Sequence, residues 1–307
     1  MKGKLSESIP EPETMTHASL NVLQDRANML SKARLFFSKR NVMEVDCPIL
    51  SSTASVDAHI DLIYSESSQV YLHSSPEYGM KKLLAGGSGD IFQLSHVFRA
   101  GEFGDKHRPE FMMTEWYRCG FSYEQMIEET CAFIQLFVGA LPITTLSYQE
   151  AFIKYAGLDP LHDELDVPVH DGVQTRDDIL NILLSLKVEP HLGKEGLTVI
   201  THYPATQCAL AKTDMVDGEL VAKRFEVYYK GLELANGYDE LTNSVEQRQR
   251  FIEANELRKK MGKDPLPIDD EFLDILDSVP DCSGVAVGFD RLMMLRHKTH
   301  KITDVIV

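Results

Sequence analysis

The feature that most constrains the fold is a pair of long β-type runs, residues 91–99 and 111–120. Both runs are rich in β-branched and aromatic residues, which favour extended strands. The connector between them, residues 100–110, is short and charged. This pattern predicts a hairpin whose two strands are joined by a mobile loop.

Further strands are expected beside this hairpin, with helices outside them. Apolar residues recur every three or four positions from Leu20 to Phe37, which predicts an amphipathic helix ending near Arg40. Ser75 and Pro76 predict an N-cap and a first helical residue. The other expected elements are strands at 70–72, 225–229, 232–235 and 283–288, and helices after Ser122, at 178–186, at 244–261, near 270–279 and from 290. Clustered strands, without regular βαβ alternation, predict an α+β fold with a largely antiparallel sheet flanked by helices.

The composition excludes several classes of protein. The 307 residues include 31 Lys and Arg against 47 Asp and Glu, and this net charge of −16 weighs against broad capture of nucleic acid. No apolar run approaches the roughly 18 residues of a membrane helix, and the N-terminus lacks the apolar core of a signal peptide. We therefore expect a cytoplasmic protein without membrane contact. Five scattered cysteines without CxxC spacing indicate buried thiols, not a disulfide framework or a zinc site.

The expected strand that begins at Phe111 carries a carboxylate among aromatic side chains. Its two-residue period places Glu115 on one face with Phe111 and Tyr117. Taken alone, this strand favours a half-exposed sheet with Glu115 in solvent. However, Arg99 and the basic loop residues 106–108 concentrate positive charge beside the same face. They favour a site for an anion such as a nucleotide phosphate.

A second hairpin is expected at residues 224–241, with a two-residue loop at Lys230 and Gly231. In the simplest register Glu226 faces Ala235, and Glu226 and Glu233 lie diagonally on one face. Two carboxylates on a buried face repel each other unless a cation joins them. Oxygen ligands with open positions suit a magnesium ion that also holds phosphates. A solvated, charged face explains the same spacing almost equally well.

Three glycines mark the remaining features. Asn236-Gly237 is expected to break the strand and to carry Glu240 into a loop. Gly284 and Gly288 allow a flat ligand to approach the backbone, although tight packing of a strand on a helix explains them equally well. Arg291 is expected in the first turn of a helix, where its guanidinium and the helix N-terminus can bind phosphate together.

The order of these segments resembles the catalytic domain of class II aminoacyl-tRNA synthetases, and the lysyl branch in particular. The matching segments are SPE at 75–77, FRAGEFGDKHRPEFMMTEWY at 98–117, ELANGYDEL at 233–241 and GVAVGFDRL at 284–292. In addition, NVMEVDCPIL at 41–50 is similar to the dimer-interface segment of that class. The resemblance covers about residues 20–307. It implies the class II fold, an ATP-dependent, AMP-forming ligase activity and a homodimer.

Chain length separates the members of this branch. A lysyl-tRNA synthetase carries an anticodon-binding domain before the dimer-interface segment, whereas only 40 residues precede Asn41 here. The chain therefore resembles the truncated paralogues that attach (R)-β-lysine to a lysine of elongation factor P. Ala286 stands where synthetases usually have glycine, and its methyl group reshapes the amino-acid pocket. We expect a flexible arm at residues 1–18 and one catalytic domain at 19–307, without tRNA anticodon contact.

The resemblance also implies roles for individual residues. The catalytic residues would be Arg99 on the α-phosphate and Arg291 on the γ-phosphate, with Phe111 stacked on adenine. The ATP-binding residues would be Arg99, Ala100, Gly101, His107, Arg108, Phe111, Glu233, Leu234, Gly288 and Arg291. β-Lysine or lysine would contact Ser75, Pro76, Glu77, Tyr117, Asn236, Glu240 and Ala286. The two ammonium groups of that substrate would pair with Glu77 and Glu240, and magnesium would be bound by Glu226 and Glu233.

Two departures from the family pattern lie in the loop over the nucleotide. The expected Arg-x-Glu reads Arg99-Ala100-Gly101, with Glu102 one place later, and Arg108 replaces the usual asparagine after His107. These changes keep open a catalytically silent, synthetase-derived binding or regulatory protein. A lysine-activating synthetase fragment that charges a small RNA is another alternative. The net negative charge and the missing anticodon-binding domain disfavour it.

Overall fold

The structure, a computed structural model, describes residues 18–53, 55–165 and 175–306. Apart from Ala18, the arm expected at residues 1–18 therefore lies outside the described residues. The expected single domain at 19–307 remains a proposal, because it includes segments that are not described. Within the described ranges, no helix is long and apolar enough to cross a membrane.

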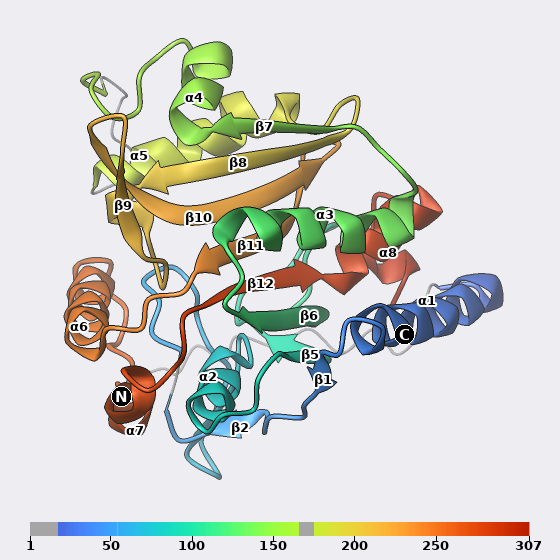
Figure 1. Cartoon of the computed structure of the whole chain (residues 1–307), viewed down its shortest axis with the longest axis horizontal. Coiled ribbons are helices and arrows are strands. Elements are labelled where there is room, and N and C mark those ends of the chain that lie inside the picture. The colour runs from blue at the N-terminus through green and yellow to red at the C-terminus, as the bar shows by residue number, and fades with distance from the viewer. Residues whose placement is uncertain (1–17, 54, 166–174, 307) are drawn as a thin grey trace, which may run out of the picture.

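A large sheet forms the centre of the described structure (Figure 1). Its strand order is β1-β5-β6-β12-β11-β10-β8-β7, and β9 pairs with β10. Only β1–β5 and β7–β8 are parallel pairs, which confirms the predicted α+β class with a largely antiparallel sheet. In the order above, the bounds are Met43–Glu44, Ile91–Phe98, Glu110–Cys119, Cys282–Gly288, Leu232–Asp239, Glu219–Tyr229, Leu197–Pro204 and Ile143–Ser147, with β9 at Thr213–Val216. A small second sheet contains β2 (Leu50–Ser51), β4 (Val70–Leu72) and β3 (Tyr64–Ser65).

Helices flank the large sheet (Figure 1). α3 (Tyr123–Val138) crosses one face and packs against β10, β11, β12 and α8 (Phe289–His297). α1 (Leu20–Ser38) contacts α3 and β1 at one end of that layer. The remaining helices are α2 (Glu77–Ala85), α4 (Tyr148–Ala156), α5 (Arg176–Leu183), α6 (Ser244–Lys260) and α7 (Asp270–Leu276), with short turns at Leu184–Val188, Glu189–His191, Ala205–Gln207 and Ile302–Asp304.

The layer between α1, α3 and the sheet is an aromatic core. Phe37 on α1 stacks on Phe92 of β5 and contacts Trp116 of β6, and all three side chains are buried. Burying each such side chain stabilises the fold by roughly 1.5–3 kcal/mol. Successive side chains along a strand point to opposite faces of the sheet. Trp116 therefore faces this core, whereas its neighbours Glu115 and Tyr117 on β6 face the other side. The predicted first helix and the hairpin of β5 and β6 are therefore confirmed. Of the stripe predicted along that helix, Ala33 and Phe37 are buried, whereas Leu20 is exposed.

Helix starts follow the local sequence at most positions. Ser122 forms the predicted capping box with Gln125 at the start of α3. Ser75, by contrast, is not the N-cap of α2, because that position belongs to Pro76. The Oγ of Ser75 accepts a hydrogen bond from the Glu77 N–H at 3.0 Å and donates one to Glu115 at 2.6 Å. The serine thus connects the helix start to the sheet.

The hairpin of β10 and β11 differs from its predicted register. Tyr228 faces Glu233 as expected, but Glu226 faces Asn236 and not Ala235. A β-bulge places Leu234 as an extra residue on β11 and shifts the rest of the strand by one position. The bulge leaves Glu226 and Asn236 directly opposite each other.

The predicted strand break at Asn236-Gly237 is wrong, because β11 continues to Asp239. A Cβ atom at Gly237 would lie 2.4 Å from the Phe225 ring and 2.9 Å from the carbonyl oxygen of Gly284. Gly237 is therefore required by close packing and does not form a turn. Glu240 follows the strand directly and is 1% exposed.

The sequence patterns also missed β7, β8 and α4, which pack together beyond β10. All five cysteines are free, as expected, but only Cys47, Cys131 and Cys282 are buried. Cys119 is half-buried at the end of β6, and Cys208 is half-buried beside a cavity. The expectation that every cysteine is buried is therefore wrong.

Candidate active site

A cavity of about 1050 Å³ lies on the face of the sheet opposite α3. The alternation of strand side chains explains its position. Val285 and Val287 of β12 point into the aromatic core, whereas Gly284, Ala286 and Gly288 line the cavity. On β6, Glu115 and Tyr117 line the same cavity as predicted from their shared face. The floor of the site is therefore the sheet itself.

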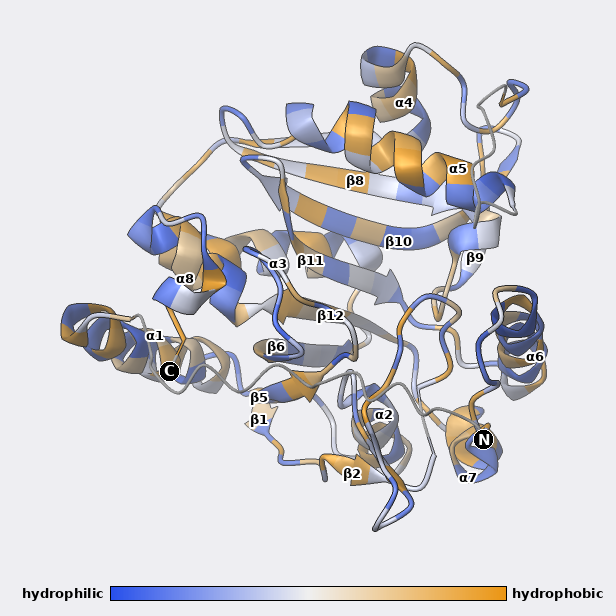
Figure 2. Cartoon of the chain, turned by 180° about the vertical axis from the view of Figure 1, so that it is seen from behind, coloured by the Kyte–Doolittle hydropathy of each residue, from blue (hydrophilic) through white to orange (hydrophobic). Residues whose placement is uncertain are grey.

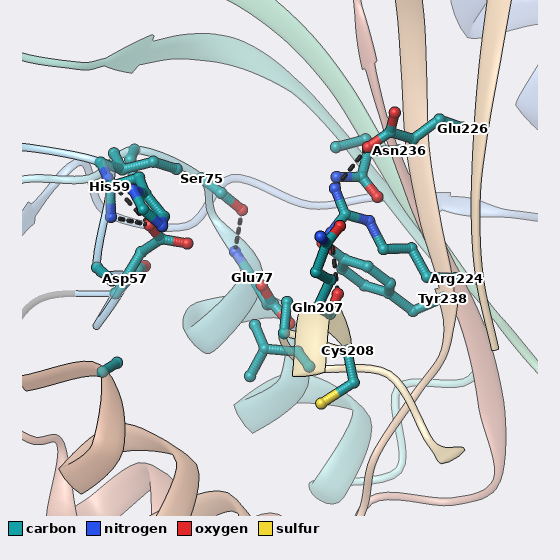
Figure 3. Close-up of a pocket in the computed structure, with 18 of the residues that line it drawn as sticks. Asp57, His59, Ser75, Glu77, Gln207, Cys208, Arg224, Glu226, Asn236 and Tyr238 are labelled. Carbon is teal, nitrogen blue, oxygen red and sulfur yellow. Dashed lines mark hydrogen bonds and ion pairs between the residues drawn. The ribbon is translucent and has the colours of Figure 1, made fainter. Parts of the chain in front are cut away.

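One row of residues crosses four strands of this floor. Glu226 on β10 faces Asn236 on β11, which faces Ala286 on β12, which in turn faces Glu115 on β6. Figure 3 shows Asn236 beside Glu226 in the cavity wall. The Ala286 methyl group thus lies between Asn236 and Glu115.

Cationic side chains gather in one half of the cavity. Arg291, in the first turn of α8, donates to the backbone oxygen of Glu233 at 2.8 Å and to Nε2 of His107 at 2.7 Å. The pKa of His107 is lowered by burial and by the Arg291 charge, so its neutral ring can accept this hydrogen bond. The guanidinium is held at the N-terminus of α8, where an anion is favoured.

Arg99 supplies a second guanidinium to this half. Its Cζ lies 5.1 Å from the centroid of the Phe111 ring, and its Nη1 lies 3.6 Å from Oε1 of Glu102. Its Nε is buried without a hydrogen-bond partner among the described residues. Glu102 thus pairs with Arg99 although it stands one place later than the family pattern. An unpartnered buried donor beside an aromatic ring suits a nucleotide phosphate and base.

Carboxylates gather in the other half of the cavity. Glu77, Glu115 and Glu240 line it and are 9%, 3% and 1% exposed. Ser75 and Tyr117 donate to the two oxygens of Glu115 at 2.6 and 2.7 Å. Figure 3 shows Ser75 above Glu77 at the start of α2. Three buried acids in one pocket are stable only when cations or protons compensate their charges.

Gly284 allows two of these side chains to approach the floor. A Cβ atom there would lie 2.3 Å from Oε1 of Glu240 and 2.4 Å from Cε1 of Tyr117. The glycine therefore makes room for the side chains of the pocket. The close contacts at Gly284 come from side chains of β6 and of the residue after β11, and not from a helix packed on the strand as the sequence suggested.

Burial raises the pKa of two carboxyl groups in this pocket. The pKa of Glu115 is raised to about 7 by burial and then by the charge of Glu77. The pKa of Glu240 is raised to about 8 by burial, partly opposed by Lys81. Glu115 and Glu240 are therefore partly protonated near neutral pH, and a bound cation would displace these protons.

These two acids predict that the free energy of unfolding falls as pH rises. An acid whose pKa is raised on folding holds its proton more tightly in the folded chain. The resulting stability is full below the ordinary pKa of 4.5 and is lost as pH rises toward about 7 for Glu115 and about 8 for Glu240. We expect the melting temperature to fall by several degrees between about pH 5 and about pH 8. Thermal unfolding of wild type and Glu115→Gln measures this, and an equal slope in both would contradict it.

The predicted magnesium ligands lie on the neighbouring strands β10 and β11, and Oε2 of Glu233 lies 3.6 Å from Nη1 of Arg291. Glu226 accepts hydrogen bonds from Tyr203 at 2.6 Å and from Tyr228. Its Oε1 pairs with Arg224 at 2.5 Å (Figure 3). The pKa of Glu233 is raised by burial and by the Glu226 charge, so a cation between them would be favourable. Among the described residues, no three acids, histidines or cysteines form a metal cluster. The residues fit a magnesium ion that takes Glu233, the remaining lone pair of Glu226 and otherwise phosphate oxygens.

The structure brings most of the predicted site residues together. Those that line the cavity are Ser75, Glu77, Arg99, His107, Arg108, Phe111, Tyr117, Glu226, Glu233, Leu234, Asn236, Glu240, Ala286, Gly288 and Arg291. Pro76, Ala100 and Gly101 do not line it. Ala100 instead donates its backbone N–H to the carbonyl oxygen of Asp61 at 2.8 Å.

The charged residues in and beside this site that sequence reasoning missed include Arg224, Glu115 and Lys81. Glu115, expected in solvent from its strand alone, is buried because α2 and Ser75 cover that face. Its place beside Tyr117 on one strand face was the available signal. Lys81 forms ion pairs with Glu77 and Glu240, and its spacing of four residues from Glu77 could have indicated the first pair.

The antiparallel sheet, with arginines over its floor and an acidic pocket beside them, defines a catalytic domain of the class II synthetase type. The family model for tRNA synthetases class II (D, K and N) matches residues 13–307, and the chain belongs to this family of ATP-dependent ligases. The resemblance identified in the sequence is thus confirmed.

Curated relatives make the assignment narrower. The chain is 43% identical over 307 residues to "Elongation factor P--(R)-beta-lysine ligase" of Haemophilus influenzae (strain PittGG), an alignment covering 94% of this chain and 95% of the relative. The proteins of the same name from Pasteurella multocida and Salmonella arizonae are 43% and 42% identical, with the same coverage of both chains. The chain is thus similar along almost its whole length to ligases that are named for elongation factor P.

Proposed function

We propose that this chain activates (R)-β-lysine with ATP as an adenylate and transfers it to a lysine side chain of elongation factor P. The observation that carries the proposal is the division of one cavity into a cationic half and an acidic half. The cationic half fits a triphosphate, and the acidic half fits a molecule with two ammonium groups. The names of the relatives supply the acceptor and the β-amino form of the substrate.

The first step requires charge stabilisation and alignment. A carboxylate that is already ionised at neutral pH attacks the α-phosphorus, and the bond from that phosphorus to pyrophosphate breaks. No proton moves in this step. Arg99 would hold the α-phosphate and Arg291 the γ-phosphate, so both guanidiniums face charge that develops in the transition state. Phe111, beside Arg99, would stack on adenine.

Magnesium would be held by Glu233, by Glu226 and by phosphate oxygens. When bound, it neutralises negative charge on the phosphates. Arg224, Tyr203 and Tyr228 hold the Glu226 carboxylate in place. Glu226 therefore contributes mainly a fixed negative charge beside Glu233.

The second step joins the activated amino acid to the acceptor. The lysine amine of elongation factor P attacks the adenylate carbonyl, a new amide bond forms, and AMP leaves as the amine loses its proton. Glu77, Glu115 and Glu240 would hold the ammonium groups of the substrate during both steps. We propose that the reaction takes place in the cytoplasm.

ATP–pyrophosphate exchange tests the activation step. We expect ATP–pyrophosphate exchange that requires magnesium and either β-lysine or lysine. Absence of exchange with either amino acid would favour a catalytically silent binding protein. Exchange followed by transfer to RNA, with none to elongation factor P, would favour the synthetase fragment.

We also expect a homodimer in solution. Large apolar side chains are exposed along the segment that resembles the class II dimer interface and the small sheet beside it, namely Met43, Ile49, Leu50 and Tyr64. Figure 2 shows β2 as a hydrophobic strand at the surface. Light scattering should give twice the chain mass of 34.6 kDa, and Leu50→Asp should shift the protein toward monomer. A monomeric mass for the wild type would contradict this expectation.

A further inference from the structure

A fully buried lysine lies behind the acidic half of the cavity. Lys81 on α2 is 0% exposed, and its Nζ lies 2.6 Å from Oε1 of Glu77 and 2.6 Å from Oε2 of Glu240. Both glutamates line the cavity, but Lys81 does not. Its ammonium group therefore contacts the two carboxylates from the side that faces away from a ligand.

This ammonium group is charged in the folded chain. Burial by itself lowers the pKa of Lys81, but Glu240 and Glu77 together raise it above its ordinary value. Glu115 on β6 and Cys282 on β12 also lie within the reach of its charge. With Glu77 and Glu240 as partners, this buried ammonium group is satisfied without any ligand.

The charges of the pocket then match a particular class of ligand. Glu77, Glu115 and Glu240 contribute three negative charges when ionised, and Lys81 contributes one positive charge. Two negative charges remain, which is the number that two ammonium groups neutralise. The carboxylate of such a diamino acid would lie toward Arg99, outside the acidic half.

We propose that Lys81 is a positioning residue that sets the preference for a diamino acid. It fixes Glu77 and Glu240 in place and cancels one of the three buried negative charges. This inference rests on the proposed function, because the ligand is the amino acid that the enzyme would activate. Without Lys81, the two glutamates repel each other and retain protons that the substrate must displace.

Lys81→Gln tests this role in pyrophosphate exchange with (R)-β-lysine. The substitution keeps a hydrogen-bond donor but removes the charge. We expect the KM for β-lysine to rise at least tenfold and the KM for ATP to change less than twofold. The KM for β-lysine should depend on pH, and the midpoint of this dependence should lie at a higher pH in Lys81→Gln than in the wild type. Lys82→Gln is the matched control, because Lys82 is the next residue on α2 and pairs with Asp269 near the surface.

A purely structural role for Lys81 would not move the pH profile. An unchanged KM for β-lysine in folded Lys81→Gln, or an unchanged pH profile, would overturn the inference. If the wild type shows exchange and Lys81→Gln matches it, only this inference fails. If the wild type shows no exchange with either amino acid, the proposed function fails first.

Loss of a buried counter-ion can also unfold the chain, so each variant is melted at about pH 6 and about pH 8. Destabilisation of Lys81→Gln that is relieved at the lower pH supports the inference, because Glu115 and Glu240 then carry protons.

The double variant Lys81→Gln with Glu240→Gln removes one charge of each sign and is compared with Glu240→Gln alone. If Lys81→Gln raises the KM for β-lysine less in the Glu240→Gln background than in the wild-type background, this supports the inference that Lys81 acts through Glu240. A rise equal to that in the wild-type background would overturn it.

Discussion

Replacing Arg291 with alanine is expected to reduce ATP–pyrophosphate exchange at least about 100-fold while the chain remains folded. The side chain is held between the Glu233 backbone and His107 at the N-terminus of α8, so it is already oriented toward the cavity. Its removal takes away a charge that would face the phosphates in the transition state. Arg99→Ala is expected to have a comparable effect, because Arg99 Nε has no other partner in the described structure.

Two variants separate charge from geometry at this position. Arg291→Lys keeps the charge but loses the planar pair of donors, so we expect only partial recovery of the rate. Arg296→Ala is the control on the same helix, because Arg296 pairs with Asp25 of α1 and does not line the cavity. An Arg291→Ala rate equal to that of Arg296→Ala would refute the phosphate site.

Glu240→Gln is expected to raise the KM for (R)-β-lysine about 100-fold and to leave the KM for ATP within twofold. Glu240 is 1% exposed and lies in the half of the cavity opposite the arginines. A substrate ammonium that loses this carboxylate remains buried without its charged partner, which is costly. The effect should therefore fall on amino-acid binding and not on nucleotide binding.

Glu256→Gln provides the matched control for this substitution. Glu256 is exposed on α6 and pairs with Lys259, three residues away. Steady-state exchange with each substrate varied in turn measures both KM values. Equal rises in the KM for ATP and for β-lysine would contradict the division of the cavity into two halves.

Local sequence patterns predicted much of the fold. The two-residue period of β6 placed Glu115 and Tyr117 on one face, and the structure puts both in the cavity. The capping box at Ser122 and the helix α1 were also predicted, because each depends on residues close in sequence. The resemblance to class II synthetases added the grouping of distant segments, which no local pattern contains.

The features that sequence reasoning missed depend on packing between distant segments. Asn236-Gly237 was expected to break the strand, but Gly237 lies within β11, where the Phe225 ring on the neighbouring strand leaves no room for a Cβ atom. The bulge at Leu234 changes the partner of Glu226, and hairpin spacing alone does not indicate it. Lys81 and Glu240 are far apart in sequence, and only the folded chain brings them within 2.6 Å.

The intact mass of elongation factor P after incubation with this protein tests the central claim most directly. With ATP, magnesium and (R)-β-lysine, we expect the mass to rise by one lysyl unit, and the rise should require all three components. The Arg291→Ala variant should leave the mass unchanged under the same conditions. No increase with a wild-type protein that is active in pyrophosphate exchange would contradict the assignment to elongation factor P.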